Sequence, residues 1–107
     1  MKNCNFKLLA SNKVGNVLYC CECKDLIIGI GTFILKFKND QSHLFLKSLQ
    51  ASHREYTQLK NRHSNKIFLK TPVSNLMLAL NDVELAQSID LIEFAFLKME
   101  INELITV

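Results

Sequence analysis

Three of the chain's four cysteines, Cys20, Cys21 and Cys23, lie within four residues of one another, between two apolar stretches. Cys20 and Cys23 have the Cys-x-x-Cys spacing, which can present two thiolates to one metal ion or close a redox-active disulfide. A closed structural zinc site needs four ligands, and the sequence has no second Cys-x-x-Cys pair. The cysteines therefore predict either a zinc site with further ligands or a redox-active thiol pair.

Cys4 is the candidate for a third zinc ligand. If the stretches on either side of Gly15 pair as a hairpin, Cys4 lies near Cys20 or Cys21 at the open end of that hairpin. A cluster of Cys4, Cys20 and Cys23 could then hold zinc, with Cys21, a histidine or a water as the fourth ligand. The alternative is that the cysteines stay reduced and pack as small apolar side chains, as free cysteines often do.

A redox-sensing function through Cys20 and Cys23 is the second hypothesis. Thioredoxin-like pairs lie at a helix N-terminus, which lowers the pKa of the thiol, whereas strands are predicted on both sides here. The sequence has no Ser/His/Asp spacing, no Gly-rich phosphate loop and no paired carboxylates in a recognisable frame, so nothing in it suggests an enzyme. His43, His53 and His63 lack the spacing of metal ligands on one helix and are expected at the surface.

The composition predicts a single domain with an apolar core, because 49% of the 107 residues are apolar and Gly and Pro are rare. The N-terminus lacks the apolar stretch of a signal peptide, and no apolar run is long enough to span a bilayer. We therefore expect a cytoplasmic protein without a membrane partner, in which the thiols stay reduced.

Positive and negative charges separate along the chain. Residues 1–80 carry a net charge of +8 and residues 81–107 a net charge of −5, unlike a uniformly basic nucleic-acid-binding protein. The segment 54–70 is basic and has Tyr56 and Phe68 as its aromatic residues. Its cations are Arg54, Lys60, Arg62, Lys66 and Lys70. Nucleic-acid binding through this segment is the third hypothesis, and a solvated loop is favoured because single-strand binding needs more interleaved aromatic residues.

Alternating apolar residues predict strands, and apolar residues at helical spacing predict helices. Strands are expected at 6–9, 17–19, 26–30, 33–38, 66–70 and 76–80. The first helix is expected over 39–52, with a polar loop or frayed helical extension after it. The second begins after Asn81, which can form a capping box with Glu84, and runs to about Met99. Residues 101–107 are expected to form a short tail or a strand.

The predicted fold class is α+β: an antiparallel sheet with two helices packed on one face and a cysteine-bearing hairpin at the N-terminus. Residues 1–25 form the hairpin, 26–59 a first ββα unit and 66–99 a second. The units recur at a period near 43 residues, which indicates either an internal duplication or a chance recurrence of a common pattern.

These features resemble an uncharacterised family of short bacterial proteins, a domain of unknown function. Members of that family pair an N-terminal Cys-x-x-Cys turn with a strand similar to residues 28–37, followed by a strand and helix similar to residues 75–85. The resemblance covers residues 4–95. It implies the architecture described above and no activity. Cys21 and Lys24 depart from the usual zinc-binding turn, which favours Gly at the second of these positions.

The second predicted helix carries more apolar residues than the buried stripe of a surface helix needs. One stripe consists of Leu85, Ile89, Ile92, Phe96 and Met99. Beside it lie Leu91, Phe94, Ala95 and Leu97. Either the sheet and the first helix cover both sides of this helix, or part of it contacts another subunit. The leading hypothesis is a small non-catalytic protein that forms a homodimer through this helix. It would act as an interaction or structural protein, with a candidate structural zinc site.

Overall fold

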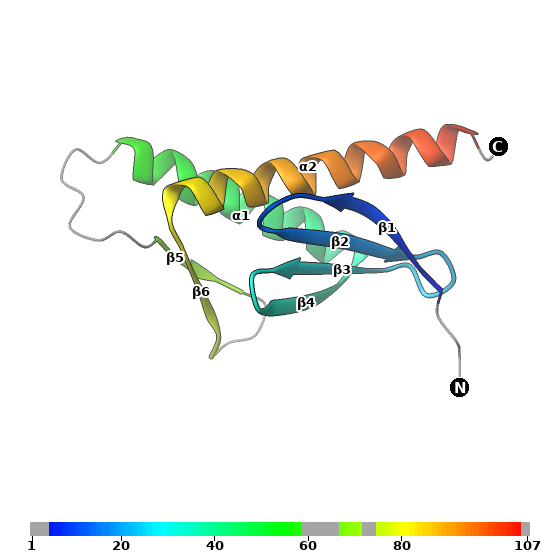
Figure 1. Ribbon diagram of the computed structural model, residues 1–107, viewed down its shortest axis with the longest axis horizontal. Coiled ribbons are helices and arrows are strands. Elements are labelled where there is room, and N and C mark those ends of the chain that lie inside the picture. The colour runs from blue at the N-terminus through cyan, green and yellow to red at the C-terminus, as the bar shows by residue number, and fades with distance from the viewer. Residues whose placement is uncertain (1–4, 59–66, 72–74, 106–107) are drawn as a thin grey trace.

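The computed structural model of the protein describes residues 5–58, 67–71 and 75–105 (Figure 1). Four strands come first: β1 Phe6–Ser11, β2 Gly15–Cys20, β3 Asp25–Ile30 and β4 Phe33–Lys38. They are followed by the helix α1 Asn39–Gln58, the strands β5 Ile67–Lys70 and β6 Met77–Leu80, and the helix α2 Asp82–Ile105. This order of elements confirms the predicted α+β class.

The strands are divided between two antiparallel sheets. β1, β2, β3 and β4 lie in that order in a four-stranded sheet, and β5 pairs with β6 in a two-stranded sheet. In the larger sheet, Val17 lies opposite Ile28, and Ile28 lies opposite Leu35. All three are buried, because strand alternation sends this row of side chains to the face that the helices cover.

Both helices pack on the same face of the four-stranded sheet. α2 contacts β1 and β2, and α1 contacts β3 and β4 (Figure 1). The two helices also contact each other and run in opposite directions across the sheet (Figure 1). Their apolar sides meet in one core, which includes Phe45 and Leu49 of α1 and Leu85 and Ile92 of α2.

α2 begins with the predicted capping box. The backbone N–H of Glu84 donates to Asn81 Oδ1 at 2.7 Å, and the backbone N–H of Asn81 donates to Glu84 Oε1 at 3.0 Å. These bonds satisfy donors that the first turn of a helix leaves without intrahelical partners. Asp82 and Glu84 also place negative charge at the positive end of the helix dipole.

α1 continues past Ser52 as far as Gln58, so the predicted alternative of a helical extension applies to residues 53–58. Tyr56 belongs to this additional part and packs against the core, which explains why the helix persists in a polar stretch of sequence. The rest of the predicted loop, residues 59–66, and the predicted turn at residues 72–74 lie outside the described residues.

α2 also extends beyond its predicted end at Met99, and the prediction of a tail or strand over residues 101–105 is wrong. The apolar residues Phe94, Leu97 and Ile101 continue the helical spacing, but they lie on the exposed side of the helix. The sequence prediction followed the buried apolar stripe of the helix, and these residues lie outside that stripe. Residues 106–107 lie outside the described part of the chain.

Asn12 ties the first hairpin to the last helix. Its Oδ1 accepts hydrogen bonds from the backbone N–H groups of Val14 at 3.0 Å and Gly15 at 3.2 Å, which closes the turn between β1 and β2. Its Nδ2 donates to the carbonyl oxygen of Gln87 in α2 at 2.9 Å, across 75 residues of sequence. The same side chain therefore shapes the hairpin turn and fixes the hairpin against α2.

Candidate functional site

The residues Cys21–Lys24 form the turn between β2 and β3, and this turn keeps Cys23 close to Cys20. The backbone N–H of Cys23 donates to Cys20 Sγ at 3.5 Å, and that of Lys24 donates to the carbonyl oxygen of Cys20 at 2.9 Å. Lys24 has a φ of 60°, the left-handed conformation that Gly or Asn usually supplies. The cysteines thus lie in a tight, hydrogen-bonded turn between two strands.

The three cysteines of this turn differ in exposure. Cys20 is buried, Cys23 is partly buried and Cys21 is exposed, and no disulfide joins any two of them. Reactive cysteines of redox proteins are partly exposed and commonly lie at a helix N-terminus. Because Cys20 is buried between strands, the turn gives the redox hypothesis no support.

Cys4, the predicted third zinc ligand, lies outside the described residues. Phe6, two residues after it, lies opposite Cys20 in the register of β1 and β2. In the part of the chain that the structure describes, no three His, Cys, Asp or Glu side chains gather closely enough to hold a metal ion. The described turn therefore offers two sulfur ligands, and a complete site needs ligands from elsewhere.

An ion pair holds the carboxylate next to the cysteine turn. Lys36 Nζ lies 3.3 Å from Asp25 Oδ2, and Asp25 is also the register partner of Lys38. The Lys36 side chain is largely exposed, so solvent screening limits the pair to about 1 kcal/mol at most. Its effect on the site is to engage Asp25 with Lys36 of β4.

The described histidines contact α2. The ring of His43 stacks on Phe96 with the ring centroids 4.2 Å apart. His53 Nε2 lies 3.3 Å from Asp82 Oδ1 at the start of α2, and Asp82 Oδ1 accepts no aligned hydrogen bond in the described part of the chain. His43 is exposed as predicted, His53 is half-buried, and His63 lies outside the described residues. These contacts give the two histidines of α1 a role in helix packing.

The outer face of α2 consists of Phe94, Leu97 and Ile101. Their exposed fractions are 57%, 53% and 46%, and their spacing of three and four residues makes them one continuous stripe. Leu91 and Ala95, beside the buried stripe, are buried, and the β1–β2 hairpin contacts α2. On this side of the helix, the alternative in which the same chain covers the apolar residues is the one that the structure shows.

Phe94 forms a ridge between two shallow grooves. One groove, of about 280 Å³, lies between α2 and residues 10–12, and Asp90 and Phe94 contribute to its lining. The other, of about 590 Å³, lies between α2 and α1, where His43 and Leu46 line it. A ridge with a groove on each side is the shape that interlocks with the side chains of another helix.

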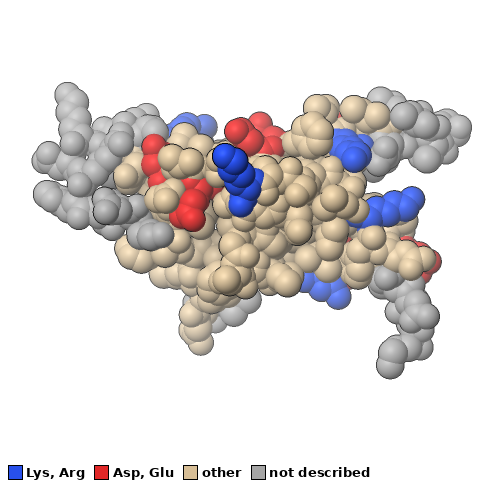
Figure 2. Space-filling view, viewed as in Figure 1, with Lys and Arg blue, Asp and Glu red and all other residues tan. Residues whose placement is uncertain are grey.

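The outer face of the four-stranded sheet carries apolar side chains beside the Asp25–Lys36 ion pair, and the sequence patterns did not predict them. Leu8, Leu18 and Ile27 form a row across three strands, and Ile34 of β4 is 74% exposed. Figure 2 shows the side on which the strands lie in front of α1, with most charged side chains near the edges around a broad uncharged middle. The sequence did hold a signal for this surface, the unbroken apolar run 26–30. A strand with only one buried face normally alternates apolar and polar residues.

The basic segment proposed for nucleic-acid binding is only partly described. Arg54 at the end of α1 and Lys70 of β5 are exposed, and Lys60, Arg62 and Lys66 lie outside the described residues. Of the two aromatic residues, Phe68 is exposed, whereas Tyr56 packs against the core. One open aromatic ring is a limited stacking surface for single-stranded nucleic acid.

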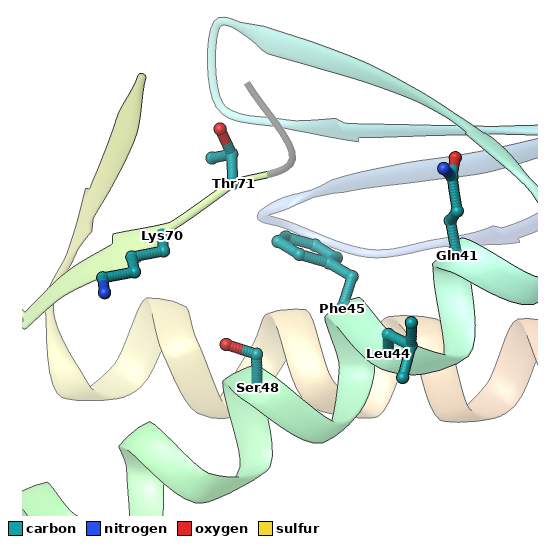
Figure 3. Close-up of a pocket in the computed structure, with 6 residues that line it drawn as sticks. All are labelled: Gln41, Leu44, Phe45, Ser48, Lys70 and Thr71. Carbon is teal, nitrogen blue, oxygen red and sulfur yellow. The ribbon is translucent and has the colours of Figure 1, made fainter. Parts of the chain in front are cut away.

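A further groove, of about 340 Å³, lies between α1 and β5 (Figure 3). Phe45 and Ser48 of α1 face Lys70 of β5 across it, and the Thr71 hydroxyl donates to the carbonyl oxygen of Leu76 at 2.8 Å. The described lining holds one cation and no carboxylate or imidazole. Its described residues therefore offer no pair of groups of the kind that acid–base catalysis uses.

The whole sequence, residues 1–107, matches the model of DUF6686, a family of unknown function. The chain belongs to this family. Membership in DUF6686 confirms the resemblance to a domain of unknown function and assigns no ligand or partner. No curated protein and no solved structure matches the chain. Within the described ranges, neither helix is long and apolar enough to cross a membrane.

Proposed function

We propose that the protein is a small, non-catalytic interaction module whose partner is a second copy of itself, bound through the outer face of α2. The observation that carries this proposal is the exposed stripe of Phe94, Leu97 and Ile101. Contiguous exposed apolar surface commonly marks a site of protein–protein contact. An isologous dimer uses the same patch on both subunits, so a single stripe on one helix suffices to form it.

An antiparallel pair of α2 helices centred on Phe94 matches the charges along this face. In a twofold arrangement, residues at equal distances on either side of the centre lie opposite each other. Asp90 and Lys98 are each four residues from Phe94, so Asp90 of one protomer faces Lys98 of the partner subunit, and the pair occurs twice. Such opposite charges favour one relative orientation of the helices more than they raise affinity.

The ridge and grooves around Phe94 suit the same arrangement. Each Phe94 ring would enter the groove beside α2 of the other protomer, and Leu97 would extend the contact along the helix. These side chains are about half exposed, so burying each contributes roughly 1 kcal/mol. Every contact is made twice in a twofold dimer, which doubles the effect of a single substitution.

Sedimentation equilibrium of the full-length chain tests the proposal. We expect a dimer at micromolar concentration and a dissociation constant raised roughly 100-fold by Phe94→Glu or Leu97→Glu, since about 3 kcal/mol of contact and charge complementarity is lost. The matched control is Ile34→Glu, which places the same charge on a more exposed residue of the outer sheet face. This control should leave the dimer unchanged. A monomeric wild-type protein, or dissociation by Ile34→Glu alone, would contradict the proposed interface.

A charge exchange tests the antiparallel orientation. Asp90→Lys should weaken the dimer by placing two like-charged pairs across the interface, and the double variant Asp90→Lys/Lys98→Asp should restore it. Circular dichroism checks that each variant keeps its helices. If the double variant does not regain the wild-type dimer affinity, the pairing centred on Phe94 is excluded. The Phe94→Glu result still tests whether the outer face of α2 is the interface.

A further inference from the structure

The two ββα units, β3–β4–α1 and β5–β6–α2, differ at the free edge of their first strand. β2 pairs with β3 along the edge that β4 leaves open, and the β1–β2 hairpin also contacts α2, the helix of the other unit. In the second unit β5 holds the corresponding place and contacts α1, but within the described ranges it pairs only with β6. The second unit therefore presents a strand edge beside a helix, at the place that a hairpin fills in the first.

The helix positions that the hairpin covers on α2 are open on α1. Gln87, whose carbonyl oxygen accepts a hydrogen bond from Asn12 of the hairpin, lies 43 positions after Leu44, which is 66% exposed. Ser48 and Leu91 are also 43 positions apart, and Ser48 is exposed whereas Leu91 is buried. These matches are matches of position in the fold and hold whatever their origin.

The groove between α1 and β5, shown in Figure 3, has an apolar floor and a positively charged rim. Phe45 is buried, and its ring stacks on Phe37 of β4 with the centroids 4.9 Å apart, which fixes the floor. Leu44 adds exposed apolar surface beside it. Lys70 faces Ser48 across the groove, and the described lining holds no carboxylate. An ammonium and a hydroxyl group can both donate hydrogen bonds to a carboxylate, so the rim suits an anionic group.

We propose that this groove binds an extended, acidic peptide segment of a partner protein, which adds a strand to the free edge of β5. In strand addition, main-chain hydrogen bonds supply affinity and the pockets for alternate side chains supply specificity. Apolar side chains of the peptide lie over Leu44 and Phe45, and a carboxylate between them in sequence meets Lys70. β5 is four residues long and ends in a lysine, two features that disfavour indiscriminate pairing of an edge. The groove is separate from the outer face of α2, so this proposal does not depend on the dimer.

Fluorescence anisotropy with two labelled peptides tests the charge of the occupant. Both peptides have about six residues, the usual length of a strand, and alternate valine with glutamate in one and with lysine in the other. We expect the full-length protein to bind the acidic peptide at least about tenfold more tightly than the basic one, and Lys70→Glu to reverse this preference. A reversal cannot come from loss of folding. Absence of binding of the acidic peptide overturns the proposal.

The matched control is Lys7→Glu, the same change of charge on an exposed lysine of β1, the edge strand of the larger sheet. It should keep the wild-type preference, and an equal change in both variants would show general electrostatic attraction instead of a site. Leu44→Ala should weaken binding of the acidic peptide by about tenfold without changing the preference, because it removes apolar surface from the groove. Unchanged affinity in Leu44→Ala would contradict this placement of the peptide.

Methylation of the peptide amides tests strand addition itself. Alternate N–H groups of a strand point to the same side, so methylating one alternate set should abolish binding and methylating the other set should not. Equal affinities of the two methylated peptides would contradict an added strand. Phe94→Glu, which targets the dimer, should bind the acidic peptide as the wild type does. If the peptide dissociated the wild-type dimer, the groove would hold a second copy of the chain, and the proposal would be wrong.

Discussion

The two ββα units of the chain, β3–β4–α1 and β5–β6–α2, place equivalent residues 43 positions apart. Buried equivalents are Leu35 and Leu78, Phe37 and Leu80, and Leu49 and Ile92. Gln50 Nε2 donates to Glu93 Oε1 at 3.4 Å, and these residues are themselves 43 positions apart. The internal duplication stays a prediction, and a chance recurrence of a common ββα pattern is its alternative.

The units differ in how completely their surfaces are covered. β3 and β4 are six residues long and β2 pairs with the free edge of β3, whereas β5 and β6 are four residues long and, in the described part of the chain, pair only with each other. Among the described side chains, α1 exposes one large apolar residue, Leu44, while α2 exposes its outer face and Val83. The N-terminal hairpin thus extends the sheet of the first unit and contacts α2, while Phe94, Leu97 and Ile101 of the second unit stay exposed.

The largest effect should come from truncating the equivalent core residues Leu49 and Ile92. Both are fully buried, so Leu49→Ala and Ile92→Ala should each lower the free energy of unfolding by about 2–5 kcal/mol. Because the units share one core, each variant should unfold in a single urea transition followed by circular dichroism. Two transitions, or a large loss in only one of the variants, would show that the units are stable separately.

A smaller effect is expected from loosening the hairpin that covers the first unit. A Cβ at Gly15 would overlap the carbonyl oxygen of Gly29 in β3, so Gly15→Ala should destabilise the protein by about 1–3 kcal/mol. Gly29→Ala is the control, because its Cβ would meet the end of the Asn16 side chain at 3.1 Å, which can move. In thermal unfolding, Gly15→Ala should have a lower melting temperature than Gly29→Ala. The reverse order would contradict this description of the β2–β3 pairing.

Removing the capping box at the start of α2 should lower the free energy of unfolding by a smaller amount than Gly15→Ala. Asn81→Ala removes the acceptor of the Glu84 N–H and should cost about 1 kcal/mol in a urea titration. Asn81→Asp keeps an acceptor oxygen at the helix N-terminus and should lose only a fraction of that amount. If the two substitutions were equally costly, the cap would not be the reason for the loss.

The smallest expected effect concerns the two left-handed residues that flank β3. Lys24 and Gly31 both have a φ of 60°. Lys24→Gly should raise the free energy of unfolding by about 0.5–1 kcal/mol, while Gly31→Ala should lower it by about 1 kcal/mol. Both are measured against the wild type by guanidinium denaturation without added zinc. A destabilising Lys24→Gly would mean that the Lys24 side chain contributes more than its backbone conformation costs.

The sequence predicted the strands and the α2 cap because their signals are local. Alternation identifies a strand from a few neighbouring residues, and the Asn81–Glu84 box needs only a four-residue pattern. The end of α2 was missed, and the extension of α1 was left open, because both depend on more than a local pattern. Tyr56 extends α1 by packing on the core, and Ile101 belongs to a stripe on the exposed side of α2.

For the candidate sites, as for the fold, the sequence predicted which elements carry the residues and did not predict their burial. The sequence placed Cys20 and Cys23 at the junction of two strands, where Cys20 ends β2 and Cys23 lies in the turn that follows. It could not show that Cys20 is buried, since that depends on how the turn folds over its sulfur atom. Likewise, the apolar excess of α2 was visible in the sequence. Which residues stay exposed depends on the docked β1–β2 hairpin, which covers Leu91 and leaves Phe94 open.

The hydrogen bond from Asn12 to the carbonyl oxygen of Gln87 also limits the order in which the chain can fold. During synthesis the first hairpin emerges well before α2, so its apolar residues Leu9 and Val17 have no helix to pack against until the C-terminal quarter has left the ribosome. Closing so long a loop is slow compared with forming a local hairpin. The docking of α2 is therefore the late step that completes the native structure, and a nascent chain halted before Gln87 should still bind chaperones.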